Sequence, residues 1–416
     1  MIHRIVIFIV VVLIFEFLAF RGLIKLIEKK KRRKIFIYFY WILSLLILMT
    51  SIAYYVYNQW LNVPDYIKVR SFFNISTISM LNLFPKIILS VFSTIDDIIV
   101  FLIFVIKRIM KRKVIKMPLY KARRVFLYSG LLLALFLFGN IIYGMAWGKN
   151  DLEIKRITIS SEKLPQSFNG FKIAQISDFH LGSFKDKQLV ENCIALLVAE
   201  KPDVILFTGD MVNNEAVEAL PYISLFKKLA PPYGMFSILG NHDMGDYRLW
   251  YSDREKSCNL NDLVRIQQEM GFEMMRNKHT YFVSGNDSIA LIGVDNWGVP
   301  PFKKYGDLKK AMQGVNRNLF TILLSHDPSH WNQEVTDKTN IDLTLSGHTH
   351  GGQMVFKMGN YTFSPVQWKY KQWMGLYNDK KQYLYVNTGI GFIGFKGRIG
   401  VKPEITMITL KSLPKI

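Results

Sequence analysis

Cysteine is scarce in this chain: its 416 residues include only Cys193 and Cys258. Two cysteines exclude a disulfide framework and a cysteine-based zinc ribbon. Cys193 opens the apolar segment 193–198, which predicts a buried structural thiol rather than a reactive one.

Acidic residues are scarce in the first third of the chain. Residues 1–150 contain 22 lysines and arginines but only 5 aspartates and glutamates, a net charge of +17 out of +21 for the whole chain. The remaining residues carry a net charge of only +4. A strongly basic chain can indicate a nucleic-acid partner. Here the excess falls on short runs between apolar stretches, without interleaved aromatics on a folded face, so no nucleic acid is expected.

Four long apolar stretches occupy the same third: 5–23, 35–56, 87–106 and 125–147. Each is close to the roughly 20 residues that cross a bilayer. A cleaved signal peptide would explain only the first stretch, and no small-residue cleavage site follows it. The pattern predicts a membrane domain over residues 1–148, with about four transmembrane helices in contact with the lipid bilayer.

The basic runs indicate how these helices are oriented. Residues 29–34 and 107–124 are strongly basic, whereas the connection 57–85 carries little charge. By the positive-inside rule the two basic loops are cytoplasmic. The amino terminus and everything after the fourth span are then expected on the extracytoplasmic side.

An acidic pair, Asp96–Asp97, interrupts the third predicted span. Acidic residues at bilayer depth are costly and are often functional. Two structural alternatives remain open: the span is shifted along the chain, or the pair lies in a re-entrant break. Glu16 in the first span raises the same question.

From residue 149 onward, short apolar runs alternate with helical segments, which predicts a layered α/β domain over residues 149–416. Helices are expected at 187–200, 216–229, 260–270 and 308–316. Closely spaced strands in the second half, at 280–283, 288–294, 383–388 and 404–410, predict a second sheet packed on the first.

Five polar clusters follow apolar runs in this domain. The runs are 173–177, 204–208, 235–239, 321–324 and 343–345, and each reads as a buried strand that ends in a loop. The clusters contain the polar residues Asp178, His180, Asp210, Asn241, His242, Asp243, His326, Asp327, His348 and His350. Five strands thus deliver oxygen and imidazole ligands to one edge of a sheet.

These residue types suit a site for two divalent metal ions. Asp178 and His180, like His348 and His350, are two residues apart and would share one side of an extended segment. Asp210 follows a glycine, where a sharp turn would free its carboxylate to bridge two cations. The remaining candidate ligands are Asn241 and His326. Three oxygen and four nitrogen donors suit Mn, Fe, Zn or Mg and not a structural zinc, and two such cations would activate a hydroxide between them.

His242 lies beside Asn241 and is expected to point away from the ligands. An uncoordinated imidazole there could bind a phosphoryl oxygen or protonate a leaving alkoxide. Asp243 could orient this imidazole or simply cap the turn. A single Gly-Asn-His-Asp segment would be an ordinary turn, and His330 is expected to begin a helix; the five clusters in this order are what point to chemistry.

The order of these clusters resembles that of the calcineurin-like metallophosphoesterase superfamily, over about residues 170–410. Segments 346–353 and 402–405 resemble a bacterial subgroup that often carries an amino-terminal membrane segment. The resemblance implies a four-layer αββα sandwich in a protein of the bacterial cytoplasmic membrane. It also implies ligand sets, with Asp210 shared: Asp178, His180 and His350 for one metal, and Asn241, His326 and His348 for the other. His242 would contact the scissile phosphate.

The chain departs from that subgroup at one place. Asn387-Thr388-Gly389 stands where Ser-Arg-Gly is often found, so a phosphate-contacting arginine is missing unless Arg398 replaces it. The departure bears on the substrate and not on the chemistry.

The leading hypothesis is a membrane-anchored phosphoesterase, with two metals and a phosphate-ester substrate that is lipid-linked or a lipid headgroup. The alternative is a nucleotide or nucleotide–lipid pyrophosphatase whose site faces the cytoplasm. A non-catalytic binding protein is disfavoured because every ligand and His242 are present. A transporter built on Asp96–Asp97 is disfavoured because four spans are few for a transport path.

Overall fold

The computed structural model describes residues 2–60, 65–109 and 119–414. The chain forms two compact units: residues 1–62 with 71–143, and residues 63–70 with 144–416. The two are described in turn below. The domain boundary predicted at residues 148 and 149 stays a prediction.

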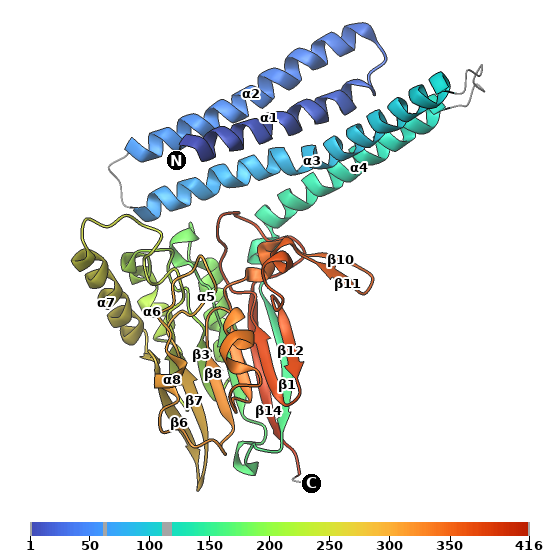
Figure 1. The fold of residues 1–416 in the computed structure, drawn as a ribbon. Helices are drawn as coiled ribbons and strands as arrows, with labels where there is room; N and C mark the ends of the chain where they lie inside the picture. The colour runs from blue at the N-terminus through green and yellow to red at the C-terminus, as the bar shows by residue number, and fades with distance from the viewer. Residues whose placement is uncertain (1, 61–64, 110–118, 415–416) are drawn as a thin grey trace. The chain divides into compact units, whose positions relative to one another are not determined.

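The first unit contains the helices α1 (Ile2–Ile24), α2 (Lys30–Trp60), α3 (Asp65–Ile109) and α4 (Leu119–Ala146), drawn in blue to teal in Figure 1. In the part of the chain that the structure describes, three helical segments are long and apolar enough to cross a bilayer: 30–54, 68–109 and 120–150. The first predicted span, 5–23, lies on α1. Helices of this length and composition form an apolar membrane domain.

The prediction that residues 57–85 connect two spans as a loop is wrong for most of this segment, which is helical. Helix α2 continues to Trp60, and α3 already begins at Asp65 and contains Pro85 in its interior. Residues 65–84 contain no glycine or proline that would end a helix. Pro85 removes one backbone donor, but its neighbours keep theirs, so α3 runs on through it.

The third predicted span, 87–106, lies within α3 and within the apolar segment 68–109. Gly22 of α1 faces Ser93 of α3, where an added Cβ would lie 3.0 Å from the serine Cβ. Gly130 of α4 lies against Phe92, so small residues allow close helix packing at this level. The side chains of residues 98–106 are apolar and largely exposed, as expected for residues of a membrane helix that face lipid.

Asp96 and Asp97 lie where α1 ends and α4 begins. The Lys25 Nζ is 2.9 Å from Asp96 Oδ2 and 2.5 Å from Asp97 Oδ1, and Arg123 Nε is 2.7 Å from Asp96 Oδ1. Arg21 Nη2 is 3.0 Å from Asp97 Oδ2. Because α3 is continuous here, the pair lies in no re-entrant break. Three cations compensate the two carboxylates, which explains the pair as a structural anchor at the basic end of the unit.

A second polar cluster lies in the middle of the unit. Glu16 is 2% exposed, and Lys86 Nζ donates to its Oε1 and Oε2 at 2.7 and 2.8 Å. Tyr40 Oη and Ser44 Oγ donate to Oε2 at 2.9 and 2.7 Å, and Asn82 Nδ2 donates to Oε1 at 3.0 Å. The carboxylate is thus fully hydrogen-bonded and joins α1 to α2 and α3.

The second unit contains two six-stranded sheets (Figure 1). The order in the first sheet is β1 (Glu153–Ser161), β14 (Glu404–Ser412), β2 (Lys172–Ile176), β3 (Val204–Phe207), β4 (Met235–Ser237), β5 (Phe272–Met274). The order in the second is β12 (Gly375–Asp379), β13 (Gln382–Val386), β9 (Leu343–Ser346), β8 (Thr321–Leu324), β7 (Asp287–Gly293), β6 (Lys278–Ser284). A small hairpin joins β10 (Phe356–Met358) to β11 (Tyr361–Phe363).

Apolar side chains fill the space between the two sheets. Val204, Leu206 and Phe236 of the first sheet pack with Leu291, Ile322, Leu324 and Leu345 of the second in one buried cluster. On the outer face of the second sheet, α8 (Leu308–Ala311) and residues 331–335 pack against β7, β8 and β13. Helices α5 (Gln188–Glu200), α6 (Ile223–Phe226) and α7 (Asp253–Glu269) belong to the outer side of the first sheet, where Phe226 packs on Phe272. These layers are those of the predicted αββα sandwich.

Two predicted helices are wrong in extent. The segment 216–229 breaks into short turns at 216–218 and 220–222 before α6, because Pro221 cannot donate a backbone hydrogen bond within a longer helix. The segment 308–316 is helical only to Ala311, and the chain turns at Gly314, where φ is +84°. Conversely α7 starts earlier than predicted, since Ser252 caps it by accepting the Glu255 N–H.

Strand direction brings the polar clusters together. Strands β2, β3 and β4 are parallel to one another, as are β7, β8, β9 and β13. Parallel neighbours end at the same edge of a sheet, and the loops that leave those ends lie side by side. The apolar runs singled out in the sequence therefore end at shared edges of two packed sheets.

Replacing Glu16 with alanine should strongly destabilise the first unit, because it leaves the Lys86 ammonium buried without its carboxylate. Loss of one member of a buried ion pair typically costs about 3 kcal/mol. We expect a lower melting temperature for the purified full chain in detergent. The double variant Glu16→Leu, Lys86→Met should recover most of that loss, and an unchanged melting temperature in Glu16→Ala would contradict the role of the pair.

Candidate metal centre

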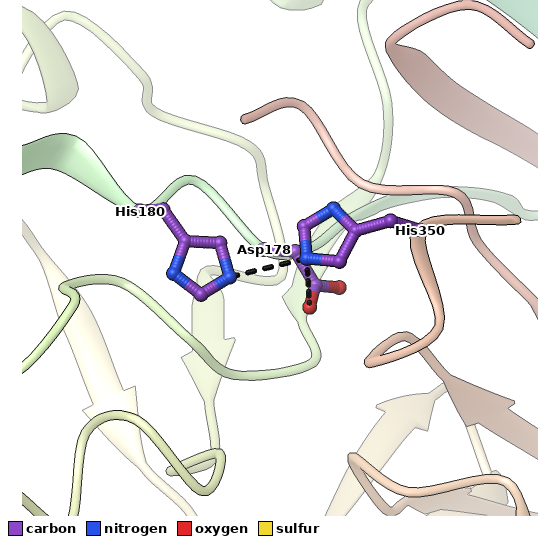
Figure 2. Close-up of side chains that lie close together, drawn as sticks. All are labelled: Asp178, His180 and His350. Carbon is purple, nitrogen blue, oxygen red and sulfur yellow. Dashed lines mark hydrogen bonds and ion pairs between the residues drawn. The ribbon is translucent and has the colours of Figure 1, made fainter. Parts of the chain in front are cut away.

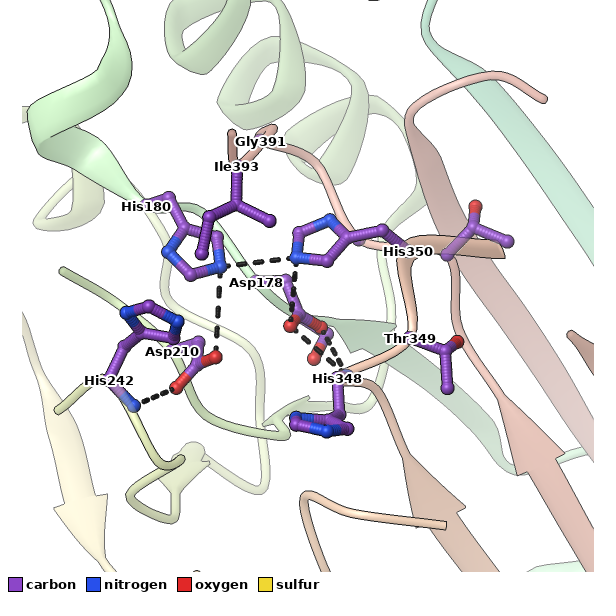
Figure 3. A network of polar contacts seen from close by, with 12 residues as sticks. Asp178, His180, Asp210, His242, His348, Thr349, His350, Gly391 and Ile393 are labelled. Carbon is purple, nitrogen blue, oxygen red and sulfur yellow. Dashed lines mark hydrogen bonds and ion pairs between the residues drawn. The ribbon is translucent and has the colours of Figure 1, made fainter. Parts of the chain in front are cut away.

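The loops after five strands carry the candidate residues to one buried place. Asp178 follows β2, Asp210 follows β3, Asn241 follows β4, His326 follows β8, and His348 follows β9. Asp178, His180, Asp210, Asn241, His326 and His350 are all at most 5% exposed, and His348 and His242 are half-buried. The seven predicted ligands and His242 all lie within this centre, and Figure 3 shows Asp178, His180, Asp210, His242, His348 and His350 together.

The expectation of extended backbone at the ligand pairs is wrong. Asp178 and His180 have φ values of +52° and +48°, and His348 and His350 have values of +72° and +51°. In this left-handed region the chain turns back on itself at the sheet edge, and aspartate tolerates it better than most residues. The turns, rather than a strand's alternation, aim each pair of side chains into the centre.

Only glycine fits at position 209, because the backbone of the neighbouring loop lies very close to it. The φ of Gly209 is +97°, and an added Cβ would lie 2.6 Å from the backbone N of Gly240. Asp210, the next residue, has φ of +60°, so the sharp turn predicted there is confirmed. The turn is held by the Asp178 N–H, which donates to the Gly209 carbonyl at 2.9 Å, and the His180 N–H, which donates to the Asp210 carbonyl at 3.1 Å.

Asp178, His180 and His350 form one ligand group. The Nε2 atoms of the two imidazoles are 3.1 Å apart, and His350 Nε2 is 3.5 Å from Asp178 Oδ1. Figure 2 shows the two rings facing each other beside the Asp178 carboxylate. One ligand atom from each residue lies close enough to the others to hold a single cation.

Asp210, His326 and His348 form a second group, which Asn241 completes. The Asn241 Oδ1 is 3.0 Å from His326 Nε2 and 2.7 Å from His348 Nδ1. His326 Nε2 is 3.1 Å from Asp210 Oδ2 and 3.2 Å from His348 Nδ1. Four ligand atoms therefore converge on one point.

Asp210 stands between the groups. Its Oδ2 lies 3.1 Å from His326 Nε2 in the second group and 3.7 Å from His180 Nε2 in the first. Its Oδ1 accepts the backbone N–H of His242 at 2.8 Å, which fixes the plane of the carboxylate (Figure 3).

Contacts behind the rings select the tautomers. His326 Nδ1 is 2.8 Å from the Thr208 carbonyl, so this nitrogen carries the proton and Nε2 presents its lone pair to the centre. His348 Nε2 is 2.7 Å from Tyr370 Oη, which leaves Nδ1 toward Asn241. Such outer partners are typical of metal-ligating histidines.

Burial keeps most of these imidazoles neutral. It lowers the pKa of His180 to about 3 and that of His348 to about 4, and together with His180 and Arg398 it holds the pKa of His350 well below the usual range. Burial likewise opposes charge on His326, but the Asp210 and Asp178 carboxylates outweigh it and raise the pKa of that ring to about 10.

The carboxylates respond to the same surroundings. Burial raises the pKa of Asp178 to about 6. For Asp210, His326 and His242 outweigh burial and hold the pKa well below its usual range. A charged Asp210 carboxylate therefore faces a protonated His326 among otherwise neutral imidazoles in a buried pocket, and a bound cation would take the place of that proton. This donor set, with lone pairs that face one another and no thiolate, fits divalent cations.

The His242 ring is held by a hydrogen bond at Nδ1. Its Nδ1 is 2.8 Å from the Asn213 carbonyl, and its ring centroid lies 4.8 Å from that of His180 and 4.5 Å from that of Tyr247. Asp243 does not orient the ring: its carboxylate accepts the backbone N–H groups of Gly240, Asp210, Met211 and Val212. Of the two predicted roles for Asp243, the structure supports the turn cap.

Arg398 is no substitute for a phosphate-contacting arginine. Its guanidinium is 1% exposed, and it donates to the carbonyls of Thr388, Gly389, Gly391 and Lys402. Its Nη2 lies 3.4 Å from His350 Nδ1, whereas the other ring nitrogen, Nε2, faces Asp178. Arg398 therefore supports the loop and ring of His350. Asn387 is also structural, since its side chain bonds Thr406 and the Gly389 N–H.

His330 precedes the helical turn 331–335, as predicted, and lies outside the ligand groups. It contacts Ser325 Oγ through Nδ1 at 2.8 Å and Glu334 through Nε2 at 3.1 Å. Sequence reasoning missed Asn213, Tyr247 and Tyr370, which contact His242, Asn241 and His348. They belong to irregular loops without a motif, so no sequence signal marked them.

Comparison with known proteins agrees with this geometry. Residues 171–352 match the family described as "Calcineurin-like phosphoesterase". Residues 3–149 match the family described as "Probable Calcineurin-like phosphoesterase, transmembrane domain". The two matches lie on either side of the change in composition near residue 149.

Curated relatives share the catalytic half. "Uncharacterized metallophosphoesterase YkuE" of Bacillus subtilis is 33% identical over 267 residues, which cover 63% of this chain and 86% of that protein. "Phosphodiesterase YaeI" of Escherichia coli is 29% identical over 243 residues, 58% of this chain and 82% of that protein. "Transmembrane protein with metallophosphoesterase domain" of Danio rerio is 27% identical over 280 residues, 65% of this chain but only 60% of the fish protein. The chain belongs to the calcineurin-like metallophosphoesterases, metal-dependent hydrolases of phosphoric esters, and it carries a transmembrane domain of that family.

Proposed function

We propose that the chain hydrolyses phosphate esters at a membrane surface with two divalent cations. Asp178, His180 and His350 would hold one, and Asn241, His326 and His348 the other, with Asp210 shared between them. The observation that carries the proposal is the position of Asp210 Oδ2, which faces an imidazole nitrogen of each ligand group. The identity of the metals, Mn, Fe, Zn or Mg, stays open.

Cations in such sites neutralise a phosphoryl group and make a hydroxide available near neutral pH. The chain's own residues would prepare this chemistry. The backbone N–H of His242 orients Asp210, and Thr208 and Tyr370 orient the rings of His326 and His348. The buried walls exclude bulk water, which strengthens every charge interaction inside.

His242 would act on the leaving group. Because Nδ1 is engaged by the Asn213 carbonyl, Nε2 alone remains for a phosphoryl oxygen or a leaving alkoxide. Burial lowers the pKa of this ring, so a proton held on Nε2 would be released readily. These properties suit a general acid.

The membrane domain narrows the range of substrates that the site could reach. Tethering confines the site to a thin layer beside the bilayer, which favours lipid-linked phosphates or lipid headgroups over soluble esters and nucleic acids. The basic segments 29–34 and 107–124 would lie on the cytoplasmic side by the positive-inside rule. The site would then face the extracytoplasmic side of the bacterial inner membrane.

Asp210→Asn should lose both metals and activity, because an amide cannot provide the charge shared between two cations. Metal content by elemental analysis and turnover of a chromogenic phosphodiester would be measured on the same sample. Asp342→Asn is the control, since this carboxylate is also mostly buried but bonds Lys163 and Thr321 in another part of the domain. Two metals and normal turnover in Asp210→Asn would refute the shared-ligand assignment.

His242→Ala should retain both metals and slow turnover by about 10²–10⁴-fold. The loss should be smaller for esters with good leaving groups, which need no protonation. His279→Ala is a matched control, because His279 Nδ1 also lies 2.8 Å from a backbone carbonyl, that of Ala311. Equal losses for good and poor leaving groups would eliminate the acid role and leave only phosphate binding.

Reporter fusions after Trp147 test the orientation. A phosphatase that is active only after export should show activity, and a fluorescent protein that folds only in the cytoplasm should stay dark. The reverse pattern would place the site in the cytoplasm, where a nucleotide or nucleotide–lipid pyrophosphatase becomes the better hypothesis.

A further inference from the structure

Cations from four separate segments gather in the second unit. They are Arg70, Lys149, Lys185 and Lys396, which we call the cationic patch. Arg70, Lys149 and Lys396 are half-buried, and Lys185 is exposed. Asp186 is the acidic neighbour of Lys149, so the patch keeps a clear excess of positive charge.

Contacts hold the patch in place. The Arg70 Nε and Nη2 atoms both donate to the Gly182 carbonyl at 3.3 Å, and Lys149 Nζ lies over the Phe392 ring, 5.7 Å from its centroid. Arg70, Lys185 and Gly182 line a cavity of about 380 Å³. Glu218 also lines it, but that carboxylate is engaged by the backbone N–H groups of residues 213–215.

Two loops of the patch start at the metal centre. Lys185 lies five residues after His180 on the same loop, and Lys396 lies on the segment that begins at Gly389 and Gly391. The Gly391 N–H donates to the Asp178 carbonyl at 2.8 Å, and Figure 3 shows Gly391 and Ile393 beside His180 and His350. An anion in the patch would therefore contact loops that also carry ligands of the candidate site.

Gathering like charges has an energetic cost. Burial and the repulsion from Arg70, Lys149 and Lys185 together lower the pKa of Lys396 to about 8. A bound anion would relieve this repulsion, and charge-assisted bonds from lysine and arginine to phosphate oxygens are strong.

Two members of the patch lie next to apolar helical segments along the chain. Arg70 belongs to the first turns of α3, at the start of the apolar segment 68–109, and Lys149 lies at the end of the apolar segment 120–150. Each lies at the end of its apolar segment that is farther, along the chain, from the basic segment 107–124. Residues at such ends reach the headgroup layer of a bilayer.

We propose that the cationic patch binds the headgroup phosphate of an anionic phospholipid at the bilayer surface. This goes beyond the proposed hydrolysis, because it describes a lipid that is bound beside the site and needs no turnover. A phospholipid is favoured over a soluble phosphate because half of the patch comes from the ends of membrane-spanning segments.

The test uses the full chain purified in detergent, titrated with phosphatidylglycerol or phosphatidylcholine of identical acyl chains. Melting temperature and lipid retention in native mass spectrometry are measured for wild type and for Lys185→Gln with Lys396→Gln. A ligand that binds only the folded state raises the melting temperature. We expect the double variant to bind phosphatidylglycerol about tenfold more weakly, with little change for phosphatidylcholine.

Lys227→Gln with Lys309→Gln is the control, because both lysines are exposed elsewhere on the same unit. It should bind phosphatidylglycerol like wild type. Equal lipid binding in the patch variant and the wild type would overturn the proposal. So would stabilisation by inorganic phosphate alone that the patch variant loses, which would indicate a site for a soluble anion. Neither measurement involves turnover, so failure of the phosphoesterase proposal would be seen separately.

Discussion

The buried carboxylate of Asp210 is the group on which the catalytic unit depends. An ionised carboxylate in an apolar interior is tolerated only where opposite charge or hydrogen-bond donors surround it. Here a backbone N–H from the next cluster holds one oxygen, and imidazoles from both sheets face the other. Asp243 in turn binds the N–H groups of the turn that carries Asp210. Loops from five strands are thereby tied to one negative charge.

The same principle organises the membrane unit. Glu16 and Asp96 are buried acids in an apolar bundle, and each is matched by cations from neighbouring helices. Lipid tails give little driving force for helix association, so polar contacts and small residues decide which faces meet. The two acidic sites therefore set the level of α3 against α1 and α4.

Much of the candidate site could be predicted from the sequence. Asp, Asn and His residues directly after apolar runs indicated both where the strands end and which ligand atoms are available. Such clusters at the ends of several buried strands are typical of a functional site. The residues behind the ligands could not be predicted: Thr208 offers a backbone carbonyl, and Tyr370 comes from an irregular loop. Arg398 remained ambiguous until its partners were seen to be carbonyl groups.

Apolar run length, strand periodicity and ligand type are local properties, so the membrane character of the first third, the layered α/β class of the rest and the donor types of the site could be predicted from the residues alone. The position of α3 along its neighbouring helices, the left-handed turns at Asp178 and His350, and the gathering of Arg70, Lys149, Lys185 and Lys396 could not. These depend on which distant segments pack together. A helix can be apolar over 42 residues, but its position along its neighbours is set by the partners that its polar side chains find.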